Sequence, residues 1–116
     1  MAAEKNFENR IKKYLDKKGA WFVKFFANAY TSSGIPDILI CLNGRFVGIE
    51  VKQEKGNVSL LQKVHLRRIG EAGGIGILAY PSGYEKLKVL IDNLSLNRDY
   101  QVEFNGEGYI EFRSEK

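Results

Sequence analysis

Apolar residues recur at helical and strand spacings along the chain and divide it into alternating elements. Through residues 4–18 they fall three or four positions apart, with lysines mostly off the apolar stripe, which predicts an amphipathic helix that Gly19 ends. Residues 20–26 are aromatic and β-branched and predict a strand. We expect the aromatic residues of this strand in the core: Trp21, Phe22, Phe25 and Phe26.

Two further strands are predicted to form a tight β-hairpin. Residues 35–42 are a short apolar run, and residues 45–52 return after an Asn-Gly pair, which is favoured where both central residues of a turn need positive φ. With a two-residue turn, counting back along both strands places Asp37 directly opposite Glu50. Directly opposed residues point to the same face of a sheet, with Cβ atoms roughly 4.5–5.5 Å apart.

A second helix and a fourth strand are predicted after the hairpin. Ser59 and Gln62 have the spacing of a capping box, with serine at the N-cap and glutamine three residues later, and they mark a helix start. The helix is expected to run to about Ala72, where two glycines end it. Residues 75–80 are almost continuously apolar and predict a buried strand.

The C-terminal third is expected to add a helix and a hairpin. Ser82 could cap a short helix over residues 84–93, and residues 100–112 resemble two strands around a glycine-rich turn. The order αβββαβ, followed by this helix and hairpin, fits a mixed sheet with helices on its faces. The predicted fold class is α/β, with one domain whose core spans residues 4–80 and whose extension spans residues 81–116.

Composition is typical of a soluble globular domain. The 116 residues are 44% hydrophobic and 28% charged, which is enough apolar material for one core. No apolar run approaches the ~20 residues of a membrane span, and the lysine-rich N-terminus lacks the apolar region of a signal peptide. Cys41, the single cysteine, suits a reducing cytoplasm, and we expect it to be buried in its strand.

Positive charge is concentrated in the N-terminal part of the chain. Residues 1–70 contain 13 lysine and arginine residues against 6 aspartate and glutamate residues, whereas residues 71–116 contain 5 against 8. Nucleic acid is the natural partner of such a surface, because lysine and arginine neutralise phosphates and release counterions. The alternative is that the lysines only keep a helix face soluble.

The predicted hairpin brings together two acids and a lysine. Two carboxylates as close as Asp37 and Glu50 repel each other, which favours a cation between them. Lys52, two residues after Glu50, projects from the same face of the strand. With one histidine and one cysteine in the chain, a metal would have to be held by oxygen, as Mg²⁺ or Mn²⁺ is.

This pattern of Pro36-Asp37 followed by Glu50-Val51-Lys52 resembles the PD-(D/E)xK nucleases, and more closely the virus-type replication-repair nuclease (VRR-NUC) domain. Other matching pieces lie between about Glu4 and Tyr80: residues 4–9, 34–37, 55–56, Ser59 and Gln62. The resemblance implies a restriction-endonuclease-like αβββαβ core and a metal-dependent DNA endonuclease. It further implies branched DNA such as Holliday junctions or flaps as substrate, a homodimer, and a phage or prophage origin.

The resemblance also assigns roles to single residues. It implies one ligand set for the metal ion: Glu8, Asp37, Glu50 and the carbonyl of Val51. Lys52 is implied to orient and activate water for attack on the phosphate. An acid in the first helix completes the site in this family, and Glu4, one turn before Glu8, could be confused with it.

For three residues, a structural explanation is the alternative. Glu8 could form an ordinary ion pair with Lys12 one turn later. Gln62 is fully explained by capping, although the family has a catalytic glutamine at the start of this helix. Gly48 either leaves room for a phosphate to approach or marks a twist in the strand.

Several exposed polar residues are candidates for contacts with DNA. They are Lys24, Tyr30, Ser33, Lys55, Lys63, His65, Arg67 and Arg68. Two functions other than catalysis fit the same residues. The chain could be a non-catalytic nucleic-acid-binding module that retains the nuclease fold, or an interaction protein whose acids and lysines form only salt bridges.

Overall fold

The computed structural model describes residues 2–28, 30 and 33–114. The helices are α1 (Ala2–Lys17), α2 (Leu60–Glu71) and α3 (Tyr84–Leu96), with a short 3₁₀ helix η1 (Pro81–Gly83). The strands are β1 (Trp21–Lys24), β2 (Ile38–Leu42), β3 (Arg45–Val51), β4 (Ile75–Ala79) and β5 (Ile110–Phe112). Within these described residues, no helix is both long and apolar enough to cross a membrane.

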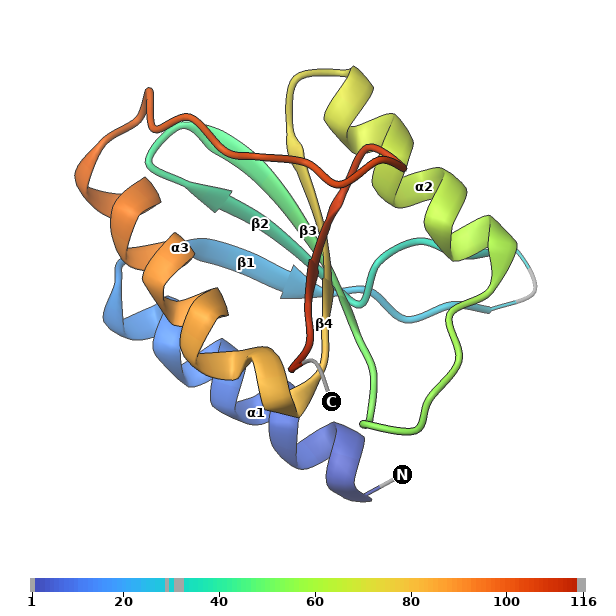
Figure 1. Cartoon of the computed structure of the whole chain (residues 1–116). Coiled ribbons are helices and arrows are strands. Elements are labelled where there is room, and N and C mark those ends of the chain that lie inside the picture. Colours follow the sequence, from blue (N-terminus) through green and yellow to red (C-terminus); the bar gives the residue numbers. More distant parts are fainter. Residues whose placement is uncertain (1, 29, 31–32, 115–116) are drawn as a thin grey trace.

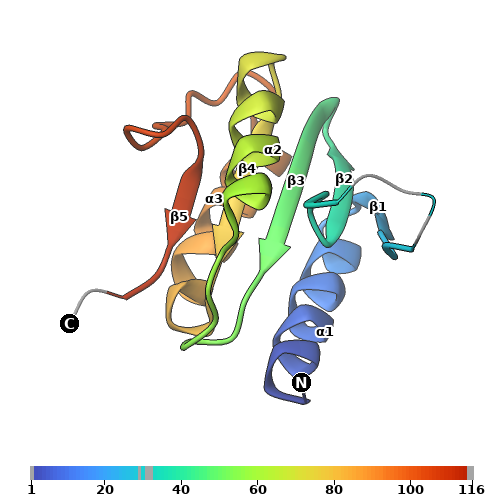
Figure 2. The same ribbon diagram turned by 90° about the vertical axis from the view of Figure 1, so that its right-hand side faces the viewer.

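The strands form one mixed sheet in the order β1-β2-β3-β4-β5 (Figure 1). β2 is antiparallel to both β1 and β3, whereas β4 is parallel to both β3 and β5. Figure 2 shows α2 on one face of the sheet and α1 and α3 on the other, so the fold has three layers. The predicted α/β class with a mixed sheet is confirmed.

The hairpin has the predicted turn and register. Asn43 has φ 51° and Gly44 has φ 82°, the positive values that a two-residue hairpin turn of this type requires. The ladder runs from Leu42 opposite Arg45 to Ile38 opposite Ile49. Asp37 directly precedes the first paired residue of β2, and therefore lies beside the position of Glu50 on β3.

The main core lies between the sheet and the layer formed by α1 and α3. The predicted apolar stripe of α1 is buried there, and every residue of β4 is buried, as expected for a central parallel strand. Its least exposed side chains include Ile11, Leu15, Ile38, Ile49, Ile77, Leu87 and Leu94. A smaller cluster around Leu66 and Leu78 fills the space under α2.

Two predictions about burial, one for the aromatic residues near β1 and one for Cys41, are wrong. Trp21 is 65% exposed and Phe26 is 71% exposed, while Phe22 points the other way and packs against the core. Cys41 is exposed as well, because it pairs with Trp21 across β1 and β2 and shares its face. The reason is that α2 packs over β3 and β4 on this face and leaves the edge strand β1 uncovered.

The C-terminal part also differs from prediction. Gly83 rather than Ser82 is the N-cap of α3, and the Ser82 hydroxyl donates instead to Glu54. The expected second hairpin is absent from the described residues: β5 is a single strand that pairs in parallel with β4. The open edge of β4 supplies the backbone partners that a second hairpin strand would have offered.

Candidate active site

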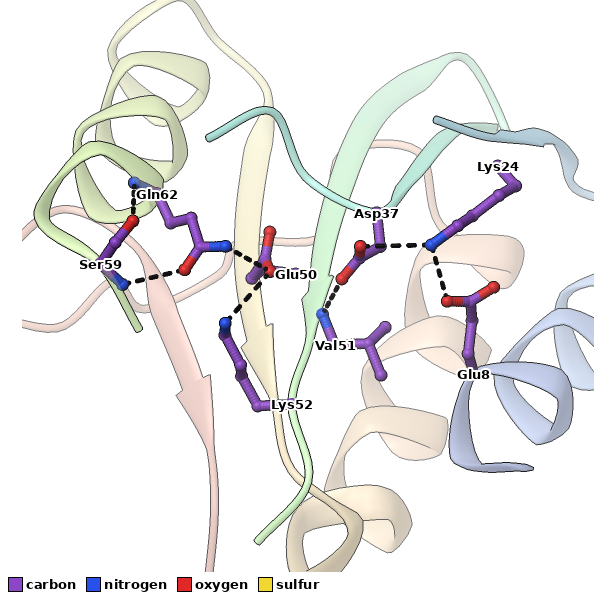
Figure 3. Close-up of polar contacts among 8 residues, drawn as sticks. All are labelled: Glu8, Lys24, Asp37, Glu50, Val51, Lys52, Ser59 and Gln62. Carbon is purple, nitrogen blue, oxygen red and sulfur yellow. Dashed lines mark hydrogen bonds and ion pairs between the residues drawn. The ribbon is translucent and has the colours of Figure 1, made fainter. Parts of the chain in front are cut away.

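The predicted site lies where β3 ends, between the first half of α1 and the start of α2 (Figure 3). The carboxylate of Asp37 is fixed to the backbone of β3, because its Oδ2 accepts a hydrogen bond from the Val51 amide at 2.8 Å. The Asp37 carbonyl accepts from the amide of Phe25 at 2.8 Å, which ties the same residue to the chain after β1. The position of Asp37 is thus set by two strands.

Glu50 is the buried acid of the site, with 3% of its surface exposed. Its Oε2 accepts a hydrogen bond from Gln62 Nε2 at 3.0 Å and lies 3.8 Å from Lys52 Nζ. Its Oε1 is buried and has no hydrogen-bond partner. Burial, together with the negative charge of Asp37, raises the pKa of Glu50 to about 8, although Lys52 acts in the opposite direction.

Gln62 caps α2, as predicted, and its side chain also contacts Glu50. The side-chain oxygen of Gln62 accepts a hydrogen bond from the backbone amide of Ser59 at 2.9 Å. The backbone amide of Gln62 donates to Ser59 Oγ at 3.1 Å, which completes the predicted capping box. The remaining side-chain nitrogen is the donor to Glu50. The cap therefore fixes the amide group in the orientation that holds the carboxylate.

Glu8 reaches the site from α1, and Lys24 connects it to the hairpin. Lys24 Nζ lies 2.8 Å from Glu8 Oε1 and 3.2 Å from Asp37 Oδ1. Lys12 Nζ is 3.2 Å from Glu8 Oε2, so the ion pair within α1 is also formed. Burial alone would raise the pKa of Glu8, but the two lysines lower it overall.

The donor chemistry of the site fits a hard divalent cation, but the acids are not assembled around one. In the part of the chain that the structure describes, no three Asp, Glu, His or Cys side chains are grouped closely enough to hold a metal ion. Lys24 lies between Glu8 and Asp37, while Glu50 is held on the α2 side (Figure 3). The unpartnered, buried Oε1 of Glu50 is nevertheless the kind of oxygen that Mg²⁺ or Mn²⁺ binds.

Gly48 packs against other residues and leaves no room for a phosphate. A Cβ at this position would lie 2.8 Å from Ile69 Cδ1 and 3.2 Å from Pro36 Cγ, so side chains from α2 and from the chain before β2 fill the space. Neither of the two expected explanations accounts for Gly48, whose missing side chain instead allows α2 to pack closely on the sheet.

The candidate DNA contacts are scattered around the site. Tyr30, Ser33 and Lys55 are exposed, and Lys55 and Lys63 line a polar cleft beside the loop that follows Lys52. Lys63 pairs with Glu107 at 3.9 Å, and Arg67 pairs with Glu71 at 3.7 Å. His65 and Arg68 line a different hollow with Phe46. Lys24 is the exception, because both of its ion pairs are with carboxylates of the site itself.

Sequence reasoning missed the bridging position of Lys24. A signal for it does exist in the sequence. Lys24 lies two residues after Phe22 on the same strand, so both side chains point to the face of β1 that packs against the core. A lysine on such a face needs an acidic partner. Sequence reasoning also missed the structural role of Glu54 in the loop after Lys52. Glu54 binds both Ser82 and Arg113 and ties that loop to the C-terminal segment.

No protein-family model matches the chain, and no curated protein sequence matches it significantly. The basis for a functional proposal is therefore chemical. It consists of a buried carboxylate with one unpartnered oxygen, a second carboxylate fixed by backbone, and a lysine and a glutamine on the first carboxylate.

Proposed function

We propose that this protein is a divalent-metal-dependent endonuclease that hydrolyses phosphodiester bonds of DNA. The observation that carries the proposal is Glu50, a buried carboxylate whose Oε1 has no hydrogen-bond partner and whose neighbour is another carboxylate, Asp37. A buried carboxylate in this position is costly in its charged form, and either a proton or a cation must compensate that charge. The order αβββαβ of the first elements, and the resemblance of the motif residues to the VRR-NUC pattern, support the same proposal.

The residues that would hold the metal ion are Asp37, Glu50, Glu8 and the carbonyl of Val51. A bound Mg²⁺ or Mn²⁺ supplies a water of lowered pKa and positive charge beside the scissile phosphate. Lys52 contributes a second positive charge 3.8 Å from Glu50, where it can orient the attacking water and offset charge on the phosphate. Gln62 keeps Glu50 in place through the hydrogen bond that the capping box orients.

The proposed substrate is branched DNA, such as Holliday junctions or flaps, cut by a homodimer in the cytoplasm. The chain measures 36 × 29 × 28 Å, which leaves little surface for reading a long base sequence. The excess of lysine and arginine in residues 1–70, the part that carries the site, favours contact with phosphates over contact with bases. Two copies would present two sites to the arms of one branched molecule.

Cleavage of labelled DNA tests this function directly. Duplex, single-stranded, flap and four-way-junction DNAs are incubated with Mg²⁺, Mn²⁺ or EDTA, with wild type beside Asp37→Ala and Lys52→Ala. Asp99→Ala and Lys86→Ala are matched controls, since both residues are exposed, Lys86 on α3 and Asp99 in the turn that follows it. We expect metal-dependent cleavage that both site variants lose and both control variants keep. The DNA that is cut fastest identifies the substrate class.

A second candidate is a nucleic-acid-binding module without catalytic activity. The observation that favours it is that Lys24 already neutralises Glu8 and Asp37, so that the acid pair can be compensated by the protein's own side chain. Tight binding that selects one DNA structure, with no cutting under any metal, would establish this candidate and overturn the enzyme.

A further inference from the structure

The bridge formed by Glu8, Lys24 and Asp37 is a cation site that a lysine of the protein occupies. The Lys24 ammonium lies 2.8 Å from one carboxylate and 3.2 Å from the other, and only 20% of its side chain is exposed. The two acids come from α1 and from the start of β2, whereas the lysine ends the edge strand β1. Three separate elements thus meet at one positive charge.

We propose that a divalent cation displaces the Lys24 ammonium from Glu8 and Asp37, and that the released ammonium then binds a phosphate of DNA. This inference rests on the proposed function and gives Lys24 a positioning role in it. A lysine is suited to the exchange because its charge sits on a flexible four-carbon stem and makes no bidentate contact. The carboxylates are suited to it because they need one cation between them but do not require a particular one.

The structure offers the released ammonium a path to the surface. Lys24 ends β1, at the uncovered edge of the sheet, and its Nζ already lies 5.8 Å from the centre of the Phe26 ring. Phe26 is 71% exposed, so the ammonium already lies near an aromatic ring at the molecular surface. A phosphate approaching the site would meet the ammonium there.

The exchange makes metal binding and DNA binding interdependent. While Lys24 holds the acids, it competes with the metal ion and lowers the apparent metal affinity. Once the metal is bound, the freed lysine adds a phosphate contact, and by linkage DNA must raise the metal affinity by the same factor. A fixed structural ion pair would produce neither effect.

Calorimetric titration of the DNA-free protein with Mn²⁺ tests the competition. Lys24→Met is compared with wild type and with Lys86→Met, the matched control, because Lys86 is exposed on α3, away from Glu8 and Asp37. We expect Lys24→Met to bind Mn²⁺ about tenfold more tightly, the size of one charge-assisted contact, and Lys86→Met to change by no more than about twofold.

A measurement on wild type covers the case that Lys24→Met does not fold. The rate at which an acylating reagent modifies each lysine is followed by mass spectrometry with and without Mg²⁺. We expect Mg²⁺ to raise the rate at Lys24 severalfold and to leave unchanged the rate at Lys88, which pairs with Glu85 on α3. An unchanged rate at Lys24, in protein that binds Mg²⁺, overturns the exchange.

The outcomes separate this inference from the nuclease proposal. Equal Mn²⁺ affinity of wild type and Lys24→Met overturns the exchange and leaves metal-dependent cleavage standing. Tighter Mn²⁺ binding by Lys24→Met, in a protein that cuts no DNA, supports the exchange and overturns the nuclease. Absence of Mn²⁺ binding from wild type and variant alike overturns both.

Discussion

Glu50 lies in surroundings that disfavour its own charge unless a cation is close. Its carboxylate is almost fully buried, faces a second acid, and has Lys52 at 3.8 Å as the positive neighbour. Structural roles alone explain Gln62 and Lys12, but they leave Oε1 of Glu50 without a partner. At the scale of single residues, this oxygen is the strongest reason to expect a bound cation.

The pH dependence of stability follows from Glu50. Its pKa is about 8 in the folded protein and 4.5 when unperturbed, so between these values the folded state binds the extra proton. The free energy of unfolding of the metal-free protein therefore falls as pH rises from about 4.5 to 8, by roughly 5 kcal/mol. Urea denaturation in EDTA across this range should show the fall in wild type and a much flatter profile in Glu50→Gln. Identical pH profiles for wild type and Glu50→Gln would contradict a raised pKa of Glu50 in the folded protein.

The elements that could be predicted are those fixed by local sequence. The Asn-Gly turn set the register of β2 and β3, the capping box set the start of α2, and together they placed Asp37, Glu50 and Gln62 within one cluster. The exposure of Cys41 depends instead on which strands the distant helix α2 covers. The pairing of the single strand β5 depends on which edge of the sheet stays open. Such tertiary choices leave no trace in a local pattern.

The capping box is predicted to support the site as well as the helix. Ser59→Ala removes the acceptor for the Gln62 amide, which should cost about 1 kcal/mol of unfolding free energy. Chemical denaturation measures this loss, with Ser33→Ala in an exposed loop as the control. If DNA is cut, Ser59→Ala should also lower the rate, because Gln62 loses the contact that aims it at Glu50.

Close packing of α2 on β4 is predicted to be intolerant of a single methyl group. A Cβ at Gly76 would overlap the Leu66 carbonyl oxygen and lie 2.9 Å from the Leu66 carbonyl carbon, both backbone atoms of the helix. Gly76→Ala should therefore destabilise the fold by about 3 kcal/mol, the upper end for overpacking. Gly106→Ala is the control, since nothing lies within 4 Å of its Cβ position. Equal melting temperatures for the two variants would show that α2 adapts.

At the scale of the whole molecule, the site is a junction between all three layers. α1 supplies Glu8, the sheet supplies Asp37 and Glu50, and α2 supplies Gln62 (Figure 3). The C-terminal segment adds a brace, because Arg113 binds the loop after Lys52 through Glu54. A cation shared by these acids would therefore connect elements far apart in sequence.

Metal binding is accordingly predicted to stabilise the entire fold. A ligand that binds only the folded state at 100 times its dissociation constant adds about 2.7 kcal/mol to the unfolding free energy. Thermal melts should show a higher melting temperature with Mn²⁺ than with EDTA in wild type, and no difference in Asp37→Ala. A melting temperature that neither chelation nor added metal changes would instead support an interaction protein held by salt bridges alone.

The pairing of Trp21 with Cys41 across β1 and β2 gives the protein its own optical reporter. These are the single tryptophan and the single cysteine of the chain, and both are exposed on the same face of the sheet, on the neighbouring strands β1 and β2. A quencher attached to Cys41 would make tryptophan emission sensitive to the distance between the two strands. Since β1 also carries Lys24, movement of this strand during cation exchange would be visible as a change in fluorescence, without any substitution in the chain.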